Sequence, residues 1–149
     1  MSDLVILVGG RGKRLGNLTN YTPKPLIKIN KKTFLDNLLS KFLKYNYEKI
    51  YLLCSYKSKK FFKLYHKKKI HNSLIYCINE GKFKDTGGAL YKLRNRIKKN
   101  FFLVNGDSYF DINMNNLKNM SLDKTIGSVA LTNNKNYKNN NKMNNLKIN

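Results

Sequence analysis

The stretch LVILVGGRGKRLGNLTNYTPKPL, residues 4–26, begins as an apolar run and changes abruptly into glycine and cationic residues. A short apolar run that ends in Gly-Gly is typical of a buried strand followed by a tight loop. The bare backbone of such a loop can approach a polyanion closely, and Arg11, Lys13 and Arg14 add positive charge beside it. The sequence therefore predicts an anion-binding loop, and a flexible basic surface loop is the alternative that these residues leave open.

Strand-like and helix-like segments alternate along the rest of the chain. Short apolar runs predict strands, and apolar residues at helical spacing predict the helices between them. The resulting β-α-β-α-β-α-β order predicts an α/β fold with a Rossmann-like, doubly wound and mainly parallel sheet. The expected helices start at Phe34, at Ser58 and near Gly87, and the expected strands are Asp3–Val8, Lys49–Ser55, Leu74–Ile78, Phe101–Val104 and Ile126–Thr132.

Ligands of such sheets bind beyond the carboxyl ends of the strands. In this sequence the loop Gly9–Gly12, the loop Glu80–Gly88 and Asp107 each follow an expected strand. We therefore expect all three to meet on one rim of the sheet. The chain has only eight acidic residues, yet four of them fall in these two loop regions: Glu80, Asp85, Asp107 and Asp111. That clustering indicates a selected role for at least one of them.

The glycine loop differs from two familiar phosphate-binding motifs. It is not a P-loop, because Leu7 occupies the position of the first glycine and Arg14 that of the magnesium-binding Ser or Thr. It is not the dinucleotide-binding fingerprint, because Leu15 stands where the third glycine belongs. Downstream, Thr22-Pro23-Lys24-Pro25 holds a lysine between two prolines that restrict the backbone. Such a lysine can be aimed at a fixed point, although an ordinary proline-rich turn has the same composition.

A formal net charge of +22 suggests either a nucleic-acid binder or a surface filled with lysine and asparagine by an AT-rich genome. We favour the second, because lysine is spread along the whole chain and arginine is scarce. The apolar run at residues 4–8 is too short for a signal peptide or a membrane span, so we expect a cytoplasmic protein with no nucleic-acid or membrane partner. We expect Cys54 and Cys77 to be buried reduced thiols, and His66 and His71 to be surface residues.

Four ordered motifs resemble the sugar-1-phosphate nucleotidylyltransferases over about residues 3 to 132. The Thr86–Ala89 and Asn105–Asp111 segments are most similar to the branch that includes the D-glycero-D-manno-heptose 1-phosphate and mannose 1-phosphate guanylyltransferases. The resemblance implies an enzyme that joins a sugar 1-phosphate to a nucleoside triphosphate, GTP in that branch, and releases pyrophosphate, for cell-surface polysaccharide synthesis. The motifs are Gly9-Gly10-Arg11-Gly12-Lys13-Arg14-Leu15, Thr22-Pro23-Lys24-Pro25, Glu80 with Thr86-Gly87-Gly88-Ala89-Leu90, and Val104-Asn105-Gly106-Asp107.

The same resemblance implies a role for each matching residue. Arg14 and Lys24 would be catalytic: Arg14 would hold the departing pyrophosphate, and Lys24 would bridge the α-phosphate and the incoming sugar phosphate. Asp107 would bind the Mg²⁺ cofactor. Catalysis would rest on positioning and charge neutralisation, because the attacking phosphate oxygen is already anionic. The nucleotide would be bound by Val8, Gly9, Gly10, Arg11, Gly12, Lys13, Glu80, Thr86, Gly87 and Gly88.

Two substitutions depart from the family pattern. Lys13 replaces the usual Thr, which adds charge beside the phosphates. Lys84-Asp85 replaces the usual Leu-Gly, so Asp85 is expected either to cap the helix that follows or to repel the nucleotide.

Members of the family are also longer, and their C-terminal half supplies a second metal-binding aspartate, sugar contacts and often an oligomer interface. We expect a nucleotide-binding domain over residues 1–132 and an Asn/Lys-rich tail over residues 133–149, either disordered or the start of a larger unit. From these 149 residues alone we expect weak binding of a nucleoside triphosphate and little turnover. A non-catalytic nucleotide-binding or regulatory domain is the alternative function, and a homo-oligomer is expected only of a full-length protein.

Overall fold

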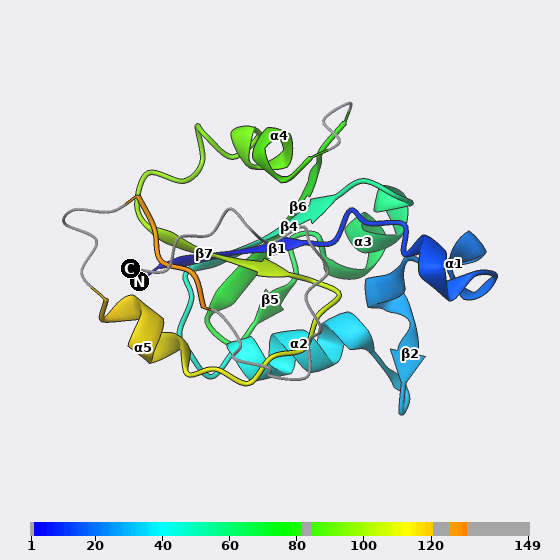
Figure 1. The fold of residues 1–149 in the computed structure, drawn as a ribbon, viewed down its shortest axis with the longest axis horizontal. Coiled ribbons are helices and arrows are strands. Elements are labelled where there is room, and N and C mark those ends of the chain that lie inside the picture. The colour runs from blue at the N-terminus through cyan, green and yellow to red at the C-terminus, as the bar shows by residue number, and fades with distance from the viewer. Residues whose placement is uncertain (1, 82–84, 121–125, 131–149) are drawn as a thin grey trace, which may run out of the picture. The chain divides into compact units, whose positions relative to one another are not determined.

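The structure is a computed structural model, and it describes residues 2–81, 85–120 and 126–130. The chain divides into one unit over residues 1–111 and a second over residues 112–149. The first unit contains a five-stranded sheet with the order β5-β6-β4-β1-β7, in which only the edge strand β5 is antiparallel (Figure 1). This confirms the expected mainly parallel sheet. Its strands are β1 (Asp3–Leu7), β4 (Lys49–Cys54), β5 (Lys69–Ile70), β6 (Ser73–Asn79) and β7 (Phe101–Asn105).

Helices and short turns connect these strands. Between β1 and β4 lie the 3₁₀ turns η1 (Lys13–Leu15) and η2 (Lys24–Leu26), the helix α1 (Leu18–Tyr21), a hairpin of β2 (Lys28–Ile29) with β3 (Lys32–Thr33), and α2 (Phe34–Phe42). The helices α3 (Ser58–Tyr65) and α4 (Thr86–Tyr91) follow β4 and β6. The second unit contains α5 (Met114–Lys118).

The order of the strands defines where the winding of the sheet reverses. From β1 the chain moves outward to β4 and β6, and then it returns across β1 to form β7 on the opposite side. The helix α4 lies on one side of the sheet and α2 on the other, as a doubly wound fold requires (Figure 1). The carboxyl ends of β1 and β7 therefore form the switch point at which such sheets bind ligands.

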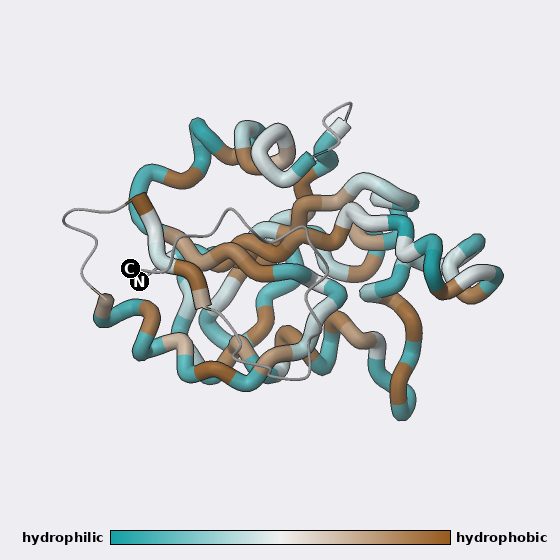
Figure 2. Tube along the Cα trace, in the orientation of Figure 1, coloured by the Kyte–Doolittle hydropathy of each residue, from teal (hydrophilic) through white to brown (hydrophobic). Residues whose placement is uncertain are grey.

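Period-two alternation distributes the apolar side chains over both faces of the sheet. On one face, Val5, Tyr51 and Leu53 pack against Ala89 and Leu93, which lie in α4 and just beyond it. The alternate residues of the same strands, including Leu4, Ile6, Ile50 and Leu52, are also fully buried. Figure 2 shows these central strands as a continuous hydrophobic band. Burial on both faces explains why β1 and β4 are apolar runs rather than alternating ones.

The helix α2 begins at a capping box. Thr33 Oγ1 accepts a hydrogen bond from the backbone N–H of Asp36, and the Asp36 carboxylate accepts one from the backbone N–H of Thr33. Two of the free donors at the start of the helix are thereby satisfied. The apolar stripe of the sequence then becomes the buried face of α2, which comprises Leu35, Leu38, Leu39 and Phe42.

Two expectations are corrected by the structure. Ile126–Thr132 was expected to be a strand, but residues 126–130 form none, and residues 131 and 132 lie outside the described residues. Ile126 and Val129 are exposed, and an apolar run becomes a strand only where a neighbouring strand satisfies its backbone. His66 was expected at the surface, but it is half-buried and its Nδ1 accepts a hydrogen bond from the backbone N–H of Cys77 at 3.1 Å. The residues 133–149 expected to form a tail lie outside the described residues, so the expected domain boundary stays a prediction.

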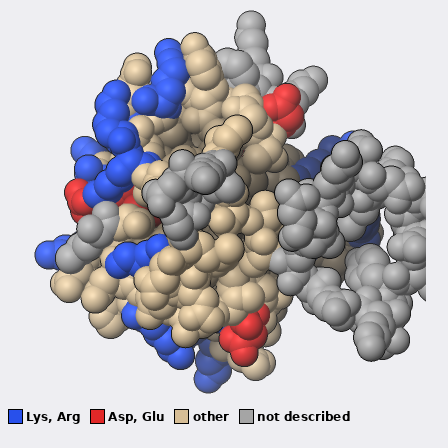
Figure 3. Space-filling model, turned by 60° about the vertical axis from the view of Figure 1, so that its left-hand side comes forward, with Lys and Arg blue, Asp and Glu red and all other residues tan. Residues whose placement is uncertain are grey.

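The two cysteines agree with expectation. Cys54 and Cys77 are both buried free thiols. Figure 3 shows basic side chains in several groups on one face, with uncharged surface between them. None of the helices in the described part of the chain combines the length and the apolar composition needed to cross a lipid bilayer.

Replacing Asp3 with Asn is expected to stabilise the protein at neutral pH. Asp3 is 3% exposed and its Oδ1 has no hydrogen-bond partner among the described residues. Burial raises the pKa of this carboxyl above 3.8, against the opposing charge of Lys99. A raised folded-state pKa means that the stability contributed by Asp3 is greatest below its unfolded pKa and is lost as pH rises through the folded value. The amide should therefore add on the order of 1 kcal/mol at pH 7.

Chemical unfolding of both proteins at pH 7 and at a pH below 3.8 measures this difference. The advantage of Asp3→Asn should shrink at the lower pH. Asp36→Asn is the opposite control: burial alone would raise the pKa of Asp36, but hydrogen bonds from Thr33 and Tyr65 lower it. Asp36→Asn should therefore destabilise the protein at pH 7. Equal stability of wild type and Asp3→Asn at pH 7 would show that the buried carboxylate is compensated.

Candidate functional site

The glycine loop, residues 9–12, is hydrogen-bonded to the end of β4 and packs against the buried carboxylate of Glu80. The Val8 N–H donates to the carbonyl of Leu53 at 2.9 Å, and the Tyr56 N–H donates to the carbonyl of Gly9 at 3.2 Å. A Cβ atom at Gly9 would lie 2.6 Å from Glu80 Oε1, closer than real Cβ contacts occur. A side chain at this position would displace the Glu80 carboxylate, so glycine lets that carboxylate lie against the loop.

The end of β7 is packed just as tightly against the same loop. The Gly106 N–H donates to the carbonyl of Leu7 at 2.9 Å, and a Cβ atom at Gly106 would lie 2.5 Å from Val8 Cγ1. Any larger residue would push β7 away from β1. The close approach places Asp107, the next residue, beside the end of β1.

Lys24 reaches Asp107 from a rigid base. It opens the turn η2, in which Pro25 and Leu26 are buried and the Leu26 N–H donates to the carbonyl of Pro23 at 2.8 Å. Lys24 Nζ lies 3.1 Å from Asp107 Oδ2. The side chains of this pair are 37% and 48% exposed. An exposed ion pair contributes only about 0–1 kcal/mol, so an arriving ligand can separate it.

The glycine loop also contacts this lysine. Gly12 has a left-handed backbone with φ of 68°, and a Cβ atom there would lie 3.0 Å from Lys24 Cβ and 3.3 Å from Thr19 Cγ2. Thr19 Oγ1 donates to the carbonyl of Gly12 at 3.2 Å. The positive φ and the close contacts both favour glycine at this position.

Two acidic side chains lie across the site from Asp107. Glu80 follows β6, is 8% exposed, and has a pKa that burial raises above 4.5. Asp85 caps α4, and its Oδ1 accepts a hydrogen bond from the Gly88 N–H at 2.6 Å. The capping role expected for Asp85 is thus confirmed, and its effect on an anionic ligand stays a prediction.

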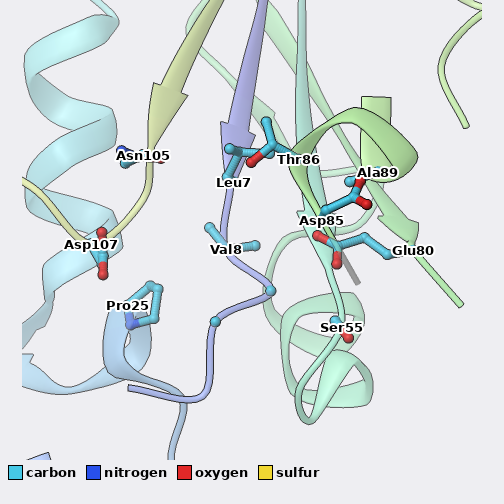
Figure 4. A pocket seen from close by; sticks show the side chains of 12 residues that line it. Leu7, Val8, Pro25, Ser55, Glu80, Asp85, Thr86, Ala89, Asn105 and Asp107 are labelled. Atoms are coloured by element: carbon cyan, nitrogen blue, oxygen red, sulfur yellow. The ribbon is translucent and has the colours of Figure 1, made fainter. Parts of the chain in front are cut away.

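These elements enclose a cavity of about 330 Å³. Figure 4 shows Glu80 and Asp85 on one side of it, Asp107 on the other and Val8 between them. Of the expected site residues, six line it: Val8, Gly9, Gly10, Glu80, Thr86 and Asp107. One further lining residue, Asp85, was expected from the sequence either to cap the helix or to repel the nucleotide. Sequence reasoning assigned no ligand-binding role to the other five, which are Leu7, Pro25, Ser55, Ala89 and Asn105.

Most of the missed residues had a signal in the sequence. Leu7 and Asn105 are the last residues of their strands and Ser55 follows β4 directly, so the rule that places ligands at strand ends applies to all three. Pro25 adjoins the expected Lys24. Ala89 belongs to the Thr86–Leu90 motif, but no local pattern indicated that α4 would bring its side chain to the rim.

The remaining expected residues lie beside the cavity or outside its lining. Lys24 does not line the cavity, but it forms an ion pair with Asp107, which does. The Arg11 guanidinium lies over the Tyr56 ring, 5.5 Å from the ring centre. Lys13 and Arg14 are exposed in η1, and Gly87 and Gly88 belong to α4. The structure thus brings the Glu80, Lys24 and Asp107 positions together and leaves Arg14 in solvent.

Comparison with known proteins assigns this arrangement to a family. A sequence model described as Nucleotidyl transferase matches residues 4–140. The chain belongs to this family. This confirms the family that the sequence resemblance implied.

Curated relatives in the family have two different names. The chain is 33% identical over 114 residues to the D-glycero-alpha-D-manno-heptose 1-phosphate guanylyltransferase of Campylobacter jejuni, covering 76% of this chain and 51% of that protein. It is 31% identical over 127 residues to the Bifunctional protein GlmU of Methanococcus maripaludis, covering 85% of this chain and 30% of that protein. The chain thus spans about half or less of the length of these relatives.

One solved structure has the same fold and is identical to this chain at a third of the aligned positions. HddC from Yersinia pseudotuberculosis, in a structure complexed with GMP-PN, has a TM-score of 0.72 and 33% identity, covering 83% of this chain and 55% of that chain. The UDP-glucose pyrophosphorylase of Acinetobacter baumannii has a TM-score of 0.63 at 11% identity and supports the fold alone. Both likenesses agree with a nucleotide-diphospho-sugar transferase fold of which this chain forms a part.

Proposed function

We propose that this chain is the nucleotide-binding part of a sugar-1-phosphate guanylyltransferase. The reaction would join GTP and a sugar 1-phosphate to give a GDP-sugar and pyrophosphate, for cell-surface polysaccharide synthesis in the cytoplasm. The observation that carries the proposal is the convergence of Gly9, Glu80 and Asp107 on one cavity at the switch point of the sheet, with Lys24 paired to Asp107 beside it. The guanylyltransferase name of a relative with 33% identity supports the choice of reaction.

The chemistry suits these residue types. A phosphate oxygen of the sugar 1-phosphate attacks the α-phosphorus of GTP, a new P–O bond forms, and the bond to the bridging oxygen breaks. The pyrophosphate departs with the electron pair. The attacking oxygen is already anionic, so no side chain needs to remove a proton. The difficulty is to bring two polyanions together, which depends on positioning and positive charge.

Lys24 and Arg14 would supply that charge. Lys24, held on the buried turn η2 and paired with Asp107, would contact the α-phosphate and the incoming sugar phosphate. Arg14 is exposed, so its proposed contact with the departing pyrophosphate requires the ligand to extend beyond the cavity toward η1. The backbone of Gly9 and Gly10 would line the path of the phosphates.

The residues present fit a magnesium ion that is coordinated partly by the protein and partly by the phosphates of the substrate. Within the described residues no three His, Cys, Asp or Glu side chains lie close enough to hold a metal by themselves. Mg²⁺ at phosphate sites is commonly held by one or two carboxylates together with phosphate oxygens and water. Asp107 lines the cavity and would be the carboxylate supplied by this chain. The ion would neutralise part of the phosphate charge.

Glu80 supports guanine as the base. Its carboxylate offers two acceptor oxygens in a mostly buried wall of the cavity. Guanine presents an N1–H and an N2 amino group side by side, and a carboxylate can accept from both. A buried acceptor left unpaired by another base would weaken binding of that base. In this proposal the choice of base therefore rests on Glu80.

Asp107→Asn is expected to remove most of the Mg²⁺-dependent part of nucleotide binding. The amide is nearly isosteric, so the fold should be retained, but it lacks the charge that a hard cation prefers. Affinity for a non-hydrolysable GTP analogue with Mg²⁺ should fall about 10–100-fold, a range typical of disturbed metal sites. Titrations in EDTA serve as the control and should differ little. Equal affinities of the two proteins in Mg²⁺ would exclude Asp107 as the ligand.

The alternative is a non-catalytic nucleotide-binding or regulatory domain. The two functions differ in turnover, and the guanylyltransferase of Campylobacter jejuni is matched over 51% of its length. Pyrophosphate release from GTP and a panel of sugar 1-phosphates should be measured for the 149-residue chain and for a fusion with the C-terminal half of that relative. We expect turnover, and any oligomer, from the fusion. Nucleotide binding without turnover in both proteins would favour the alternative.

A further inference from the structure

A largely covered lysine on α2, Lys41, holds the segment that follows Asp107. The side chain of Lys41 is 11% exposed, although it is a cation. Its Nζ donates to the backbone carbonyl of Phe110, lies 2.6 Å from Asp111 Oδ1, and sits 4.5 Å from the centre of the Tyr109 ring. One ammonium group thus contacts three consecutive residues.

The three contacts of Lys41 differ in strength, because an exposed partner is screened by water and a covered one is not. Asp111 is 94% exposed, and an ion pair with so exposed a carboxylate contributes little. The Phe110 carbonyl is a directional acceptor for a charged donor, and the Tyr109 ring attracts the cation through its face. The neighbouring Phe42 ring packs on the Phe110 ring with centres 5.6 Å apart. The end of α2 therefore holds residues 109–111 mainly through the Phe110 carbonyl and the rings of Tyr109 and Phe110.

A second anchor lies on the other side of Asp107. Gly106 is fixed to β1 by its hydrogen bond to Leu7 and by its close contact with Val8. Asp107 is half exposed, so burial does not fix its carboxylate. The short stretch between Gly106 and Tyr109 is held at both ends, and within it Ser108 Oγ donates to Asp107 Oδ1 at 3.2 Å.

We propose that Lys41 is a positioning residue for the ligand site at Asp107, acting through the backbone of residues 109–111. Lys41 is not among the residues that line the cavity, so its effect on a ligand must pass through that segment. Without the lysine, the segment would keep the Gly106 anchor and the packing of Phe110 on Phe42 but would lose its polar anchor, and the Asp107 carboxylate would spend less time where Lys24 and the phosphates meet. This inference rests on the proposed function, because it presupposes that Asp107 acts toward Mg²⁺ and nucleotide.

Lys41→Met in the full 149-residue chain tests the role. Methionine keeps the length and packing of the side chain but cannot donate to the carbonyl. Affinity for a non-hydrolysable GTP analogue in Mg²⁺ should fall about tenfold, the lower part of the range for residues that support a metal site from outside. Affinity in EDTA should stay within about twofold, and amide hydrogen exchange should accelerate at residues 107–111 but not in β4.

Two further variants make the test specific. Asp111→Asn removes the exposed ion pair and leaves the Phe110 carbonyl contact, so it should behave like the wild type. Tyr109→Ala lies at a position that is 65% exposed and should fold even where Lys41→Met does not. It removes the ring from the same ammonium and should weaken Mg²⁺-dependent binding in the same direction by a smaller factor.

The outcomes separate this inference from the proposed function. A wild-type protein whose nucleotide affinity does not depend on Mg²⁺ would contradict the proposed role of Asp107 and the role of Lys41 with it. A wild-type dependence that Lys41→Met and Tyr109→Ala both retain would overturn the role of Lys41 alone. Equal losses in Mg²⁺ and in EDTA would also overturn it, because they indicate general damage to the fold.

Discussion

Lys24→Ala is expected to lower turnover roughly a hundredfold while nucleotide affinity changes far less. The lysine would contact charge that develops at the α-phosphate in the transition state, and losing one such contact costs about 2–4 kcal/mol. In the free protein, the partner it leaves behind is an Asp107 that is half exposed and can be solvated by water. Ground-state binding therefore has little to lose, and the effect should appear in kcat.

The measurement needs a protein that turns over, which we expect of the fusion with the C-terminal half of a relative. Lys28→Ala is the matched control, since it removes an exposed lysine four residues further on, in β2. It should leave kcat within about twofold. Unchanged turnover in Lys24→Ala would reduce Lys24 to a surface lysine. A parallel loss in both variants would point instead to the net charge of the site.

Glu80→Gln is expected to lower the preference for GTP over other nucleoside triphosphates by about 10–100-fold. The amide of glutamine presents an N–H₂ group where guanine also presents donors, so one of the two hydrogen bonds is lost. A bidentate contact to a base contributes about 1–3 kcal/mol to discrimination. Affinities for GTP, ATP, UTP and CTP, measured for both proteins, give the preference directly. An unchanged ratio would remove Glu80 from base recognition.

Asp85→Asn provides the contrast within the same cavity. Asparagine is also a good helix cap and can keep the hydrogen bond to Gly88, so the structural role survives. The substitution removes a negative charge from the lining, and it should strengthen binding of every nucleoside triphosphate by a similar factor. A change in affinity without a change in base preference would separate charge from recognition.

The buried carboxylate also sets a pH dependence. Burial raises the pKa of Glu80 above 4.5, so the carboxylate that would accept from guanine becomes protonated at a higher pH than an ordinary glutamate. GTP preference should therefore fall on acidification before exposed carboxylates titrate. The stability contributed by Glu80 is greatest below the unfolded pKa and is lost as pH rises through the folded value, so Glu80→Gln should be at least as stable as the wild type at pH 7.

The sheet and its order of elements were predictable from local pattern. The ends of β1, β4, β6 and β7 agree with the expected strands to within a residue, because each of these strands is a short apolar run. In β1 and β4 the run reflects burial on both faces of the sheet, whereas most of β7 is exposed or half-buried. The same reasoning failed at residues 126–130, where an apolar stretch forms no strand. A strand also needs a neighbour to satisfy its backbone, and composition does not reveal that neighbour.

The site was predictable wherever its residues follow strands. Val8, Gly9, Glu80 and Asp107 all stand at or just after carboxyl ends of strands, and the parallel arrangement brings such ends to one rim. The mounting of Lys24 between prolines was also visible in the sequence, although the direction of its side chain was not. Its 3.1 Å contact with Asp107 joins residues 83 positions apart.

By itself, the sequence determined the class of fold, the family and the strand ends that would bear the site, because these depend on local periodicity and on short motifs. Only the tertiary structure decided that a side chain at Gly106 would collide with Val8, that Glu80 would lie buried against Gly9, and that Lys41 would reach the backbone after Asp107. Each of these is a contact between segments distant in the chain. Such contacts depend on how the packed elements approach one another, which no local pattern of residues specifies.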